Sequence, residues 1–194
     1  MPDGNTVWSD LVAAHATSND PRDPDGSYPE HRPLAAVLAC SDARVPPSIL
    51  FGRSPGEFFE VRIAGNSATD DAVASLTYAV AHLDVPLVLV LGHTGCGAVG
   101  AALSADVPAD LRAVIAPIDE AFDRPDATTD DPDLAVVANV RLNMRRLTRD
   151  RGPIGTAIAD GSVALRGAVH DLRSNQLVDV SDADDPTFPT TTRK

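Results

Sequence analysis

Residues 86–97 read Pro-Leu-Val-Leu-Val-Leu-Gly-His-Thr-Gly-Cys-Gly, and this segment carries the strongest indication of the fold class. Its five consecutive aliphatic residues, Leu87 to Leu91, predict a strand buried on both faces, as inner strands of a parallel sheet are. Immediately upstream, apolar residues at helical spacing predict a helix between residues 67 and 83. The residues that carry this helical spacing are Val73, Leu76, Tyr78, Val80 and Leu83.

Two further apolar runs precede this unit. Leu34 to Ala39 forms a continuous run that ends in Cys40, and Glu57 to Ile63 reads Glu-Phe-Phe-Glu-Val-Arg-Ile. Both are predicted strands, and the strand, helix, strand order indicates a parallel sheet. Downstream we expect short helical fragments over 104–133, a helix over 134–149, and late strands over 162–170 and 176–180. The predicted fold class is α/β, a single domain with a mostly parallel central sheet flanked by helices and an N-terminal helical arm.

The length of 194 residues suits one compact domain. Residues 1–33 are predicted to form the arm, with an amphipathic helix over 5–16 capped by Asn5 or Thr6 and followed by a polar loop. The domain itself is expected to span 34–180, and residues 181–194 are expected to form a flexible acidic tail. No repeat of 20 to 50 residues is found.

The chain is strongly acidic, with 28 Asp plus Glu against 16 Lys plus Arg and a net charge of −12. This charge argues against nucleic acid or anionic membranes as partners. The acids are 24 Asp and 4 Glu, and the bases are 15 Arg and one Lys. Such a surface suits a salt-adapted, halophilic protein; a genome-wide composition bias is the alternative. The N-terminus carries no signal-peptide pattern, so a cytoplasmic location is expected.

Two cysteines cannot form the disulfide framework of a secreted protein. Cys40 follows one predicted strand, and His93 and Cys96 follow another, at the sheet edge where open α/β folds build their sites. A buried cysteine alone is more often a small core residue. Together, two thiolates and an imidazole are typical ligands of tetrahedral Zn²⁺, with the fourth position left to water or a carboxylate.

Asp42 and Arg44 lie two and four residues after Cys40. The simpler interpretation is a surface ion pair, which contributes at most about 1 kcal/mol. Beside a metal, however, Asp42 would either occupy the fourth ligand position or, if Arg44 holds it by a bidentate bond, accept a hydrogen bond from a water at the metal.

Four segments, in this order and spacing, resemble the β-class carbonic anhydrases. They are Cys40-Ser41-Asp42-Ala43-Arg44-Val45, Arg62-Ile63-Ala64-Gly65-Asn66, Ser75-Leu76-Thr77-Tyr78-Ala79-Val80 and Gly92-His93-Thr94-Gly95-Cys96-Gly97-Ala98. The resemblance covers about residues 33–103 and returns at Asn139-Val140 and near Gly167 to Asp171.

The resemblance implies reversible hydration of carbon dioxide to bicarbonate and a proton. It implies one Zn²⁺ per chain held by Cys40, His93 and Cys96, with Asp42 and Arg44 as the catalytic pair. It also implies an obligate homodimer, often a larger homo-oligomer, whose clefts lie at the subunit interface. By position, Phe59 and Tyr78 would line the cleft, and the backbone amide of Gly97 would face the substrate.

The sequence departs from the family pattern at several positions. His31 stands where the family usually has a glutamine that binds substrate, and it is a candidate for the same hydrogen bond or for a proton relay. An ordinary loop histidine is the alternative. Ala43, Ile63 and Thr77 replace the polar Ser, Asn and Glu that are common at these positions.

Three alternative functions stay open. A zinc hydrolase of carbonyl sulfide or carbon disulfide would use the same scaffold, and an inactive zinc-binding module would keep the same ligands. The third alternative is a dinucleotide-binding domain, because Gly95 to Gly100 matches G-x-G-x-x-G after a strand. That interpretation leaves Cys40, Asp42 and His93 unexplained.

Overall fold

The structure is a computed structural model that describes residues 2–17, 27–28, 30–104, 106–122 and 131–182. The chain divides into two units, Met1–His31 and Arg32–Lys194. Most of the expected C-terminal tail, residues 183–194, lies outside the described residues, as does the 18–26 part of the arm. The boundaries of the arm and the tail therefore stay predictions.

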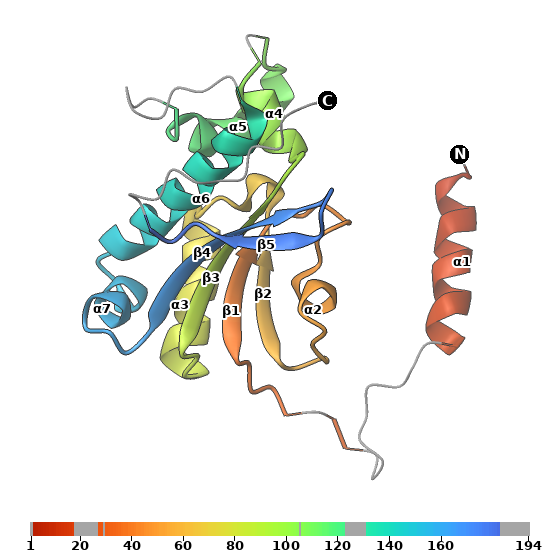
Figure 1. Cartoon of the computed structure of the whole chain (residues 1–194). Helices are drawn as coiled ribbons and strands as arrows, with labels where there is room; N and C mark the ends of the chain where they lie inside the picture. Colours follow the sequence, from red (N-terminus) through yellow and green to blue (C-terminus); the bar gives the residue numbers. More distant parts are fainter. Residues whose placement is uncertain (1, 18–26, 29, 105, 123–130, 183–194) are drawn as a thin grey trace. The chain divides into compact units, whose positions relative to one another are not determined.

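The described residues of the first unit include helix α1, over Gly4–Thr17 (Figure 1), which confirms the predicted N-terminal helix. Its cap is Asp3, not Asn5 or Thr6 as the sequence suggested. The Asp3 carboxylate accepts from the backbone N–H groups of Asn5 at 3.0 Å and Thr6 at 3.1 Å. A charged carboxylate satisfies two otherwise unpaired donors there, which a residue inside the first turn cannot do.

The second unit is built on a five-stranded sheet in the order β2-β1-β3-β4-β5 (Figure 1). The strands are β1 (Ala35–Ala39), β2 (Phe58–Arg62), β3 (Leu87–His93), β4 (Ala164–Asp171) and β5 (Gln176–Asp179). Strands β2, β1, β3 and β4 are parallel, and β5 runs antiparallel to β4. The predicted parallel α/β fold is confirmed, and the carboxyl ends of β1, β2, β3 and β4 share one edge.

Two long helices cover this sheet: α3 (Asp70–His82) packs on β1 and β2, and α6 (Pro132–Arg149) packs on β3 and β4. The remaining helical elements are α2 (Pro47–Leu50), η1 (Ala64–Asn66), α4 (Gly97–Ala102), η2 (Ala109–Leu111), α5 (Arg112–Asp119) and α7 (Pro153–Ala159). Helix α7 contacts both α3 and α6, so these three helices lie on the same face. None of the helices in the described ranges is long and apolar enough to cross a membrane.

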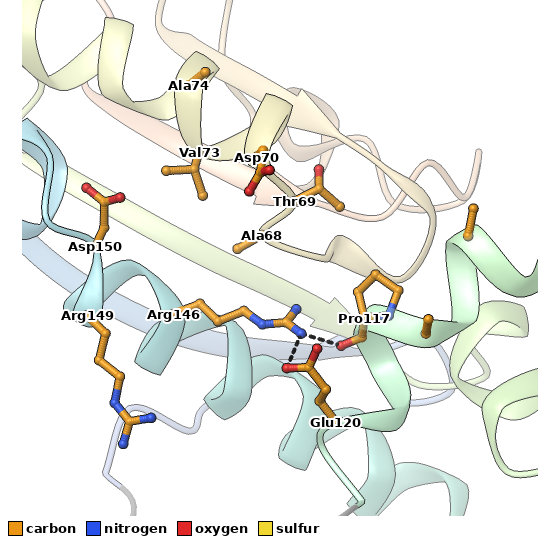
Figure 2. A pocket seen from close by; sticks show the side chains of 12 residues that line it. Ala68, Thr69, Asp70, Val73, Ala74, Pro117, Glu120, Arg146, Arg149 and Asp150 are labelled. Atoms are coloured by element: carbon orange, nitrogen blue, oxygen red, sulfur yellow. Dashed lines mark hydrogen bonds and ion pairs between the residues drawn. The ribbon is translucent and has the colours of Figure 1, made fainter.

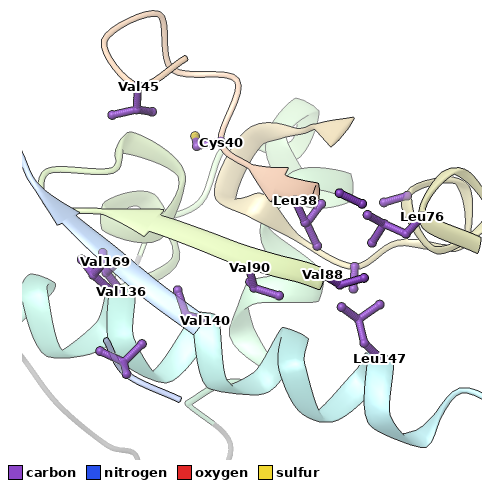
Figure 3. Packing of buried hydrophobic residues seen from close by; sticks show 14 of the residues in the cluster. Leu38, Cys40, Val45, Leu76, Val88, Val90, Val136, Val140, Leu147 and Val169 are labelled. Atoms are coloured by element: carbon purple, nitrogen blue, oxygen red, sulfur yellow. The ribbon is translucent and has the colours of Figure 1, made fainter. Parts of the chain in front are cut away.

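Side chains of β1 alternate between two apolar clusters, as the two-residue period of a strand requires. Ala36, Leu38 and Cys40 join the larger cluster under the helices (Figure 3). Val37 and Ala39 join a smaller cluster on the opposite face. Both faces of β1 are therefore buried, which explains its uninterrupted apolar sequence and fixes the place where Cys40 emerges.

Helix α6 lies close to β3 at Gly92, directly before His93. A Cβ atom at Gly92 would lie 2.6 Å from Val140 Cγ2 and 3.0 Å from Val136 Cγ1. We expect Gly92→Ala to lower the free energy of unfolding by about 1–3 kcal/mol, because these β-branched side chains must be displaced. Urea unfolding measures this change.

Gly100→Ala is the matched control, because its Cβ would meet nothing within 4 Å. In helix α4 this exchange should leave stability unchanged or raise it by about 1 kcal/mol. Equal unfolding midpoints for Gly92→Ala and the wild type would contradict the tight contact between α6 and β3.

Candidate metal centre

The predicted metal ligands lie at adjacent strand ends. Cys40 follows the last residue of β1, and His93 is the last residue of β3, which pairs with β1 in parallel. The sequence placed His93 just after the strand, but the ladder between β3 and β4 continues to the pair His93 and His170. Cys96 follows a turn and directly precedes α4. Gly95 makes this turn with a φ of 66°, a conformation that glycine adopts without strain.

The three side chains converge on one point. The ligand atoms of Cys40, His93 and Cys96 all lie within 4.8 Å of one another, and the two Sγ atoms are 3.9 Å apart. Tetrahedral zinc with Zn–S bonds of about 2.3 Å places two sulfur ligands about 3.8 Å apart. All three residues are buried, with exposed fractions of 5%, 1% and 5%. The donor set and its spacing fit Zn²⁺.

The imidazole of His93 is oriented for coordination. Its Nδ1 lies 3.0 Å from the backbone oxygen of Thr94, which can only accept, so Nδ1 carries the proton. Its Nε2 is buried and has no hydrogen-bond partner in the described part of the chain. Burying a nitrogen lone pair that accepts no hydrogen bond costs folding free energy. Coordination of a metal ion by Nε2 would remove this cost.

The two thiols are electrostatically coupled. Hydrogen bonding from Cys96 lowers the pKa of Cys40 to about 4, and the same hydrogen bond together with burial raises the pKa of Cys96. The Cys40 thiol is therefore the more readily deprotonated of the two, and the thiolate is the form that metals bind.

Asp42 and Arg44 form the bidentate pair that the sequence suggested. Arg44 Nε donates to Asp42 Oδ1 at 2.9 Å, and a terminal nitrogen of Arg44 donates to Oδ2 at 2.6 Å. The same nitrogen also donates to the carbonyl of Gly95 at 3.2 Å, so the pair bridges the two ligand-bearing segments. Hydrogen bonds from Arg44 hold the pKa of Asp42 well below its usual range. Asp42 Oδ2 lies 3.9 Å from His93 Nε2, so this charged carboxylate faces the ligand atoms.

Arg62 is a site residue whose role was not predicted from the sequence. Its side chain donates to the carbonyl oxygens of Cys40 at 3.0 Å and Asp42 at 2.6 Å. Arg62 ends β2, the neighbour of β1, so the one available signal was its position at the common strand edge. Its guanidinium fixes the backbone that carries Cys40 and Asp42.

Four predicted substrate-binding residues do not belong to the group of metal ligands. Phe59 of β2 and Tyr78 of α3 lie side by side, with ring centroids 6.1 Å apart, and Tyr78 is half-exposed. Gly97 is the exposed first residue of α4, next to Cys96. His31 belongs to the first unit. The substrate-binding roles of these four residues stay predictions.

A pocket of about 900 Å³ lies away from this centre, between α3, α5 and α6 (Figure 2). Arg146 reaches into it and donates to Glu120 at 2.7 Å and to the carbonyl of Pro117 at 2.9 Å. The charges of Arg146 and Glu120 are therefore paired with each other. Neither cysteine lines this pocket, so its volume does not mark the chemical site.

The segment Gly95 to Gly100 lacks the context of a dinucleotide fingerprint. It forms a turn and helix α4 of only six residues. In the described part of the chain, the strand after α4 is β4, which begins at Ala164. A dinucleotide-binding unit needs a longer helix that leads directly into the next strand.

Comparison with known proteins agrees with this centre. A family model for carbonic anhydrase matches residues 35–177. A carbonic anhydrase of Mycolicibacterium smegmatis is 50% identical over 74 residues, 38% of this chain and 36% of that protein. Carbonic anhydrase 2 of Mycobacterium tuberculosis is 38% identical over 117 residues, 54% of this chain and 56% of that protein. The chain therefore spans about a third to a half of the length of these two relatives.

A solved structure extends the likeness to most of the fold. It is one of the tetrameric β-carbonic anhydrases from the filamentous ascomycete Sordaria macrospora, with a TM-score of 0.70 and 26% identity. The match covers 90% of this chain and 92% of that chain. Residues 35–177, which the family model matches, include strands β1 to β4 and the side chains Cys40, His93 and Cys96, and the chain belongs to the β-class carbonic anhydrase family.

Proposed function

We propose that this protein catalyses the reversible hydration of carbon dioxide to bicarbonate and a proton, using one Zn²⁺ held by Cys40, His93 and Cys96. The observation that carries this proposal is the buried cluster of two sulfurs and one imidazole, with the sulfurs 3.9 Å apart, in a chain of this family. When bound, zinc supplies a Lewis acid that makes water a nucleophile near neutral pH.

Asp42 and Arg44 are proposed to orient that water. Asp42 is charged at working pH, because Arg44 keeps its pKa low, and a charged carboxylate can only accept hydrogen bonds. Its Oδ2 faces the ligand atoms and would accept a hydrogen bond from the water, which would aim the oxygen lone pair at carbon dioxide. The two hydrogen bonds from Arg44 would hold Asp42 in this position and oppose its coordination to the metal.

The remaining chain supplies the surroundings of the substrate. The backbone amide of Gly97 is proposed to face carbon dioxide or bicarbonate, because it lies directly after Cys96 and is exposed. Phe59 and Tyr78 are proposed to line an apolar cleft, and His31 to hydrogen-bond substrate. An apolar cleft suits a linear, uncharged substrate with no hydrogen to donate.

The test is a stopped-flow assay of carbon dioxide hydration with the zinc-loaded chain at high salt, with carbonyl sulfide and carbon disulfide hydrolysis measured alongside. We expect fast hydration of carbon dioxide and one zinc per chain. Faster turnover of either sulfur compound would replace this proposal with a hydrolase, and zinc binding without any turnover would indicate an inactive module.

We further propose that the active form is a homodimer or a larger homo-oligomer. The apolar side chains Val7, Trp8, Leu11 and Val12 of α1 are exposed, with fractions of 41% to 66%, and offer apolar surface for a second copy. The comparison structure from Sordaria macrospora is tetrameric, which supports the same assembly class.

Assembly and activity are expected to depend on salt, as in a halophilic protein. Each chain carries a net charge of −12, so two copies repel each other unless salt screens them. The screening length falls from about 10 Å at 0.1 M to about 3 Å at 1 M salt. We expect both the oligomer fraction and the hydration rate to fall on transfer to dilute buffer, measured by sedimentation velocity and stopped flow. Undiminished assembly and activity in dilute buffer would leave the acidic composition without this role.

A further inference from the structure

The proposed zinc ligand His93 depends on a single oxygen for its orientation. Its Nδ1–H donates to the backbone carbonyl of Thr94 at 3.0 Å. This bond directs Nε2 towards Cys40 and Cys96 and fixes the ring tautomer. Any movement of the Thr94 peptide would therefore rotate the imidazole away from the ligand cluster.

Thr94 is itself held from the end of β4. Its backbone N–H donates to the carbonyl of His170 at 3.0 Å. Its hydroxyl donates to Asp171 Oδ1 at 2.9 Å and accepts from the backbone N–H of Leu172 at 3.0 Å. Thr94 is only 2% exposed. The hydroxyl is thus used as both donor and acceptor, and water has little access to replace either bond.

The partner carboxylate is also fixed. Asp171 Oδ2 accepts from the Ser174 hydroxyl at 2.7 Å, and Oδ1 accepts from the backbone N–H of Arg173 at 3.0 Å. The hydrogen bond from Ser174 is the main cause that lowers the pKa of Asp171 to about 2. The Asp171 carboxylate therefore stays charged and accepts hydrogen bonds at neutral pH. It belongs to the hairpin of β4 and β5 and lies 77 residues from Thr94 in sequence.

We propose that Thr94 and Asp171 form a positioning pair, in which the Asp171 carboxylate holds the Thr94 hydroxyl so that the Thr94 carbonyl orients His93 for the metal. This inference rests on the proposed zinc function, and it assigns to the hairpin between β4 and β5 a part in metal binding. Both residues would act on the chemistry through the His93 ring, because Thr94 contacts that ring through its carbonyl and Asp171 contacts Thr94.

Thr94→Val and Thr94→Ser are a matched pair for testing this role. Valine keeps the branched shape of Thr94 and removes the hydroxyl, whereas serine keeps the hydroxyl. We expect Thr94→Val to bind zinc about 10-fold more weakly, the usual cost of losing an outer-shell partner, and Thr94→Ser to retain nearly wild-type affinity. Competition with a chelator on the full chain gives the affinity, and the absorption spectrum of the Co²⁺-loaded chain reports the ligand geometry.

Ser174→Ala is the control for general damage to the hairpin. It removes another hydrogen bond to the same carboxylate but leaves the bond from Thr94 to Asp171 in place. We expect a smaller loss of zinc affinity than in Thr94→Val and an unchanged Co²⁺ spectrum. Thermal unfolding of each metal-free chain separates loss of stability from loss of metal affinity.

Two results would overturn the positioning role while the proposed function stands. One is wild-type zinc affinity and Co²⁺ spectrum in Thr94→Val; the other is an equal loss in Thr94→Val and Ser174→Ala that follows their stability. Should Thr94→Val fail to fold, Asp171→Asn must weaken zinc binding, because it removes the charge that strengthens the same hydrogen bond. A wild-type chain that holds no zinc would instead overturn the proposed function, and this inference with it.

Discussion

Cys40→Ser is expected to hold no zinc and to hydrate carbon dioxide no faster than the solution reaction. A serine hydroxyl stays protonated near neutral pH and is a poor ligand, whereas Cys40 has a pKa lowered by its hydrogen bond from Cys96 and is ready to bind as thiolate. The remaining ligands, His93 at the end of β3 and Cys96 just after the following turn, leave the ion without support from β1. Elemental analysis of zinc and the stopped-flow assay measure the two effects together.

The metal-free wild type is the reference for this variant. Cys40 is small and lies at the end of the core, so we expect the metal-free Cys40→Ser chain to unfold within about 1 kcal/mol of the metal-free wild type. One zinc per chain in Cys40→Ser would remove Cys40 from the ligand set. Loss of zinc through unfolding would show as a large difference between the two metal-free chains.

Asp42→Asn is expected to keep its zinc and lose about 100-fold in the hydration rate, the scale of misplacing a reacting group. An asparagine has the same shape but carries an N–H₂ group and no charge. Its side chain would satisfy the bidentate donors of Arg44 less well and would present a donor where the water needs an acceptor. The measurement is kcat by stopped flow with zinc content determined on the same sample.

Asp71→Asn makes the same chemical change on an exposed carboxylate of α3 and should leave both quantities unchanged. A wild-type kcat in Asp42→Asn would assign Asp42 to the surface ion pair of the simpler interpretation. Simultaneous loss of zinc would instead place Asp42 among the ligands.

The sheet and the ligand cluster were accessible from sequence because they depend on strong local patterns. Continuous apolar runs such as Leu87 to Leu91 identify strands buried on both faces, and parallel strands bring their carboxyl ends to a common edge. Cys40, His93 and Cys96 stand at those ends, so topology alone brings them together. By contrast, α2 and α7 have four and seven residues, too short for a helical period to be recognised.

The supporting contacts could not be predicted in the same way. The roles of Arg62 and of the pair formed by Thr94 and Asp171 arise from hydrogen bonds across 20 to 77 residues, whose partners are set by strand register. The cap of α1 was missed because Asp3 lies outside the apolar pattern that marks the helix. The substrate-binding roles of Phe59, Tyr78, Gly97 and His31 stay predictions, because a cleft between copies would depend on an assembly that no spacing in one chain encodes.

The central place of β1 has a consequence for the lifetime of the site. β1 lies between β2 and β3, and both of its faces are buried. Backbone amides in such a strand exchange with solvent only through large-scale opening, not through local fluctuation. Cys40 directly follows this strand, and Arg62 ties its carbonyl to β2. The position of Cys40 should therefore persist in the metal-free protein for as long as the sheet remains folded, so that a chain that has lost its ion could bind another without refolding.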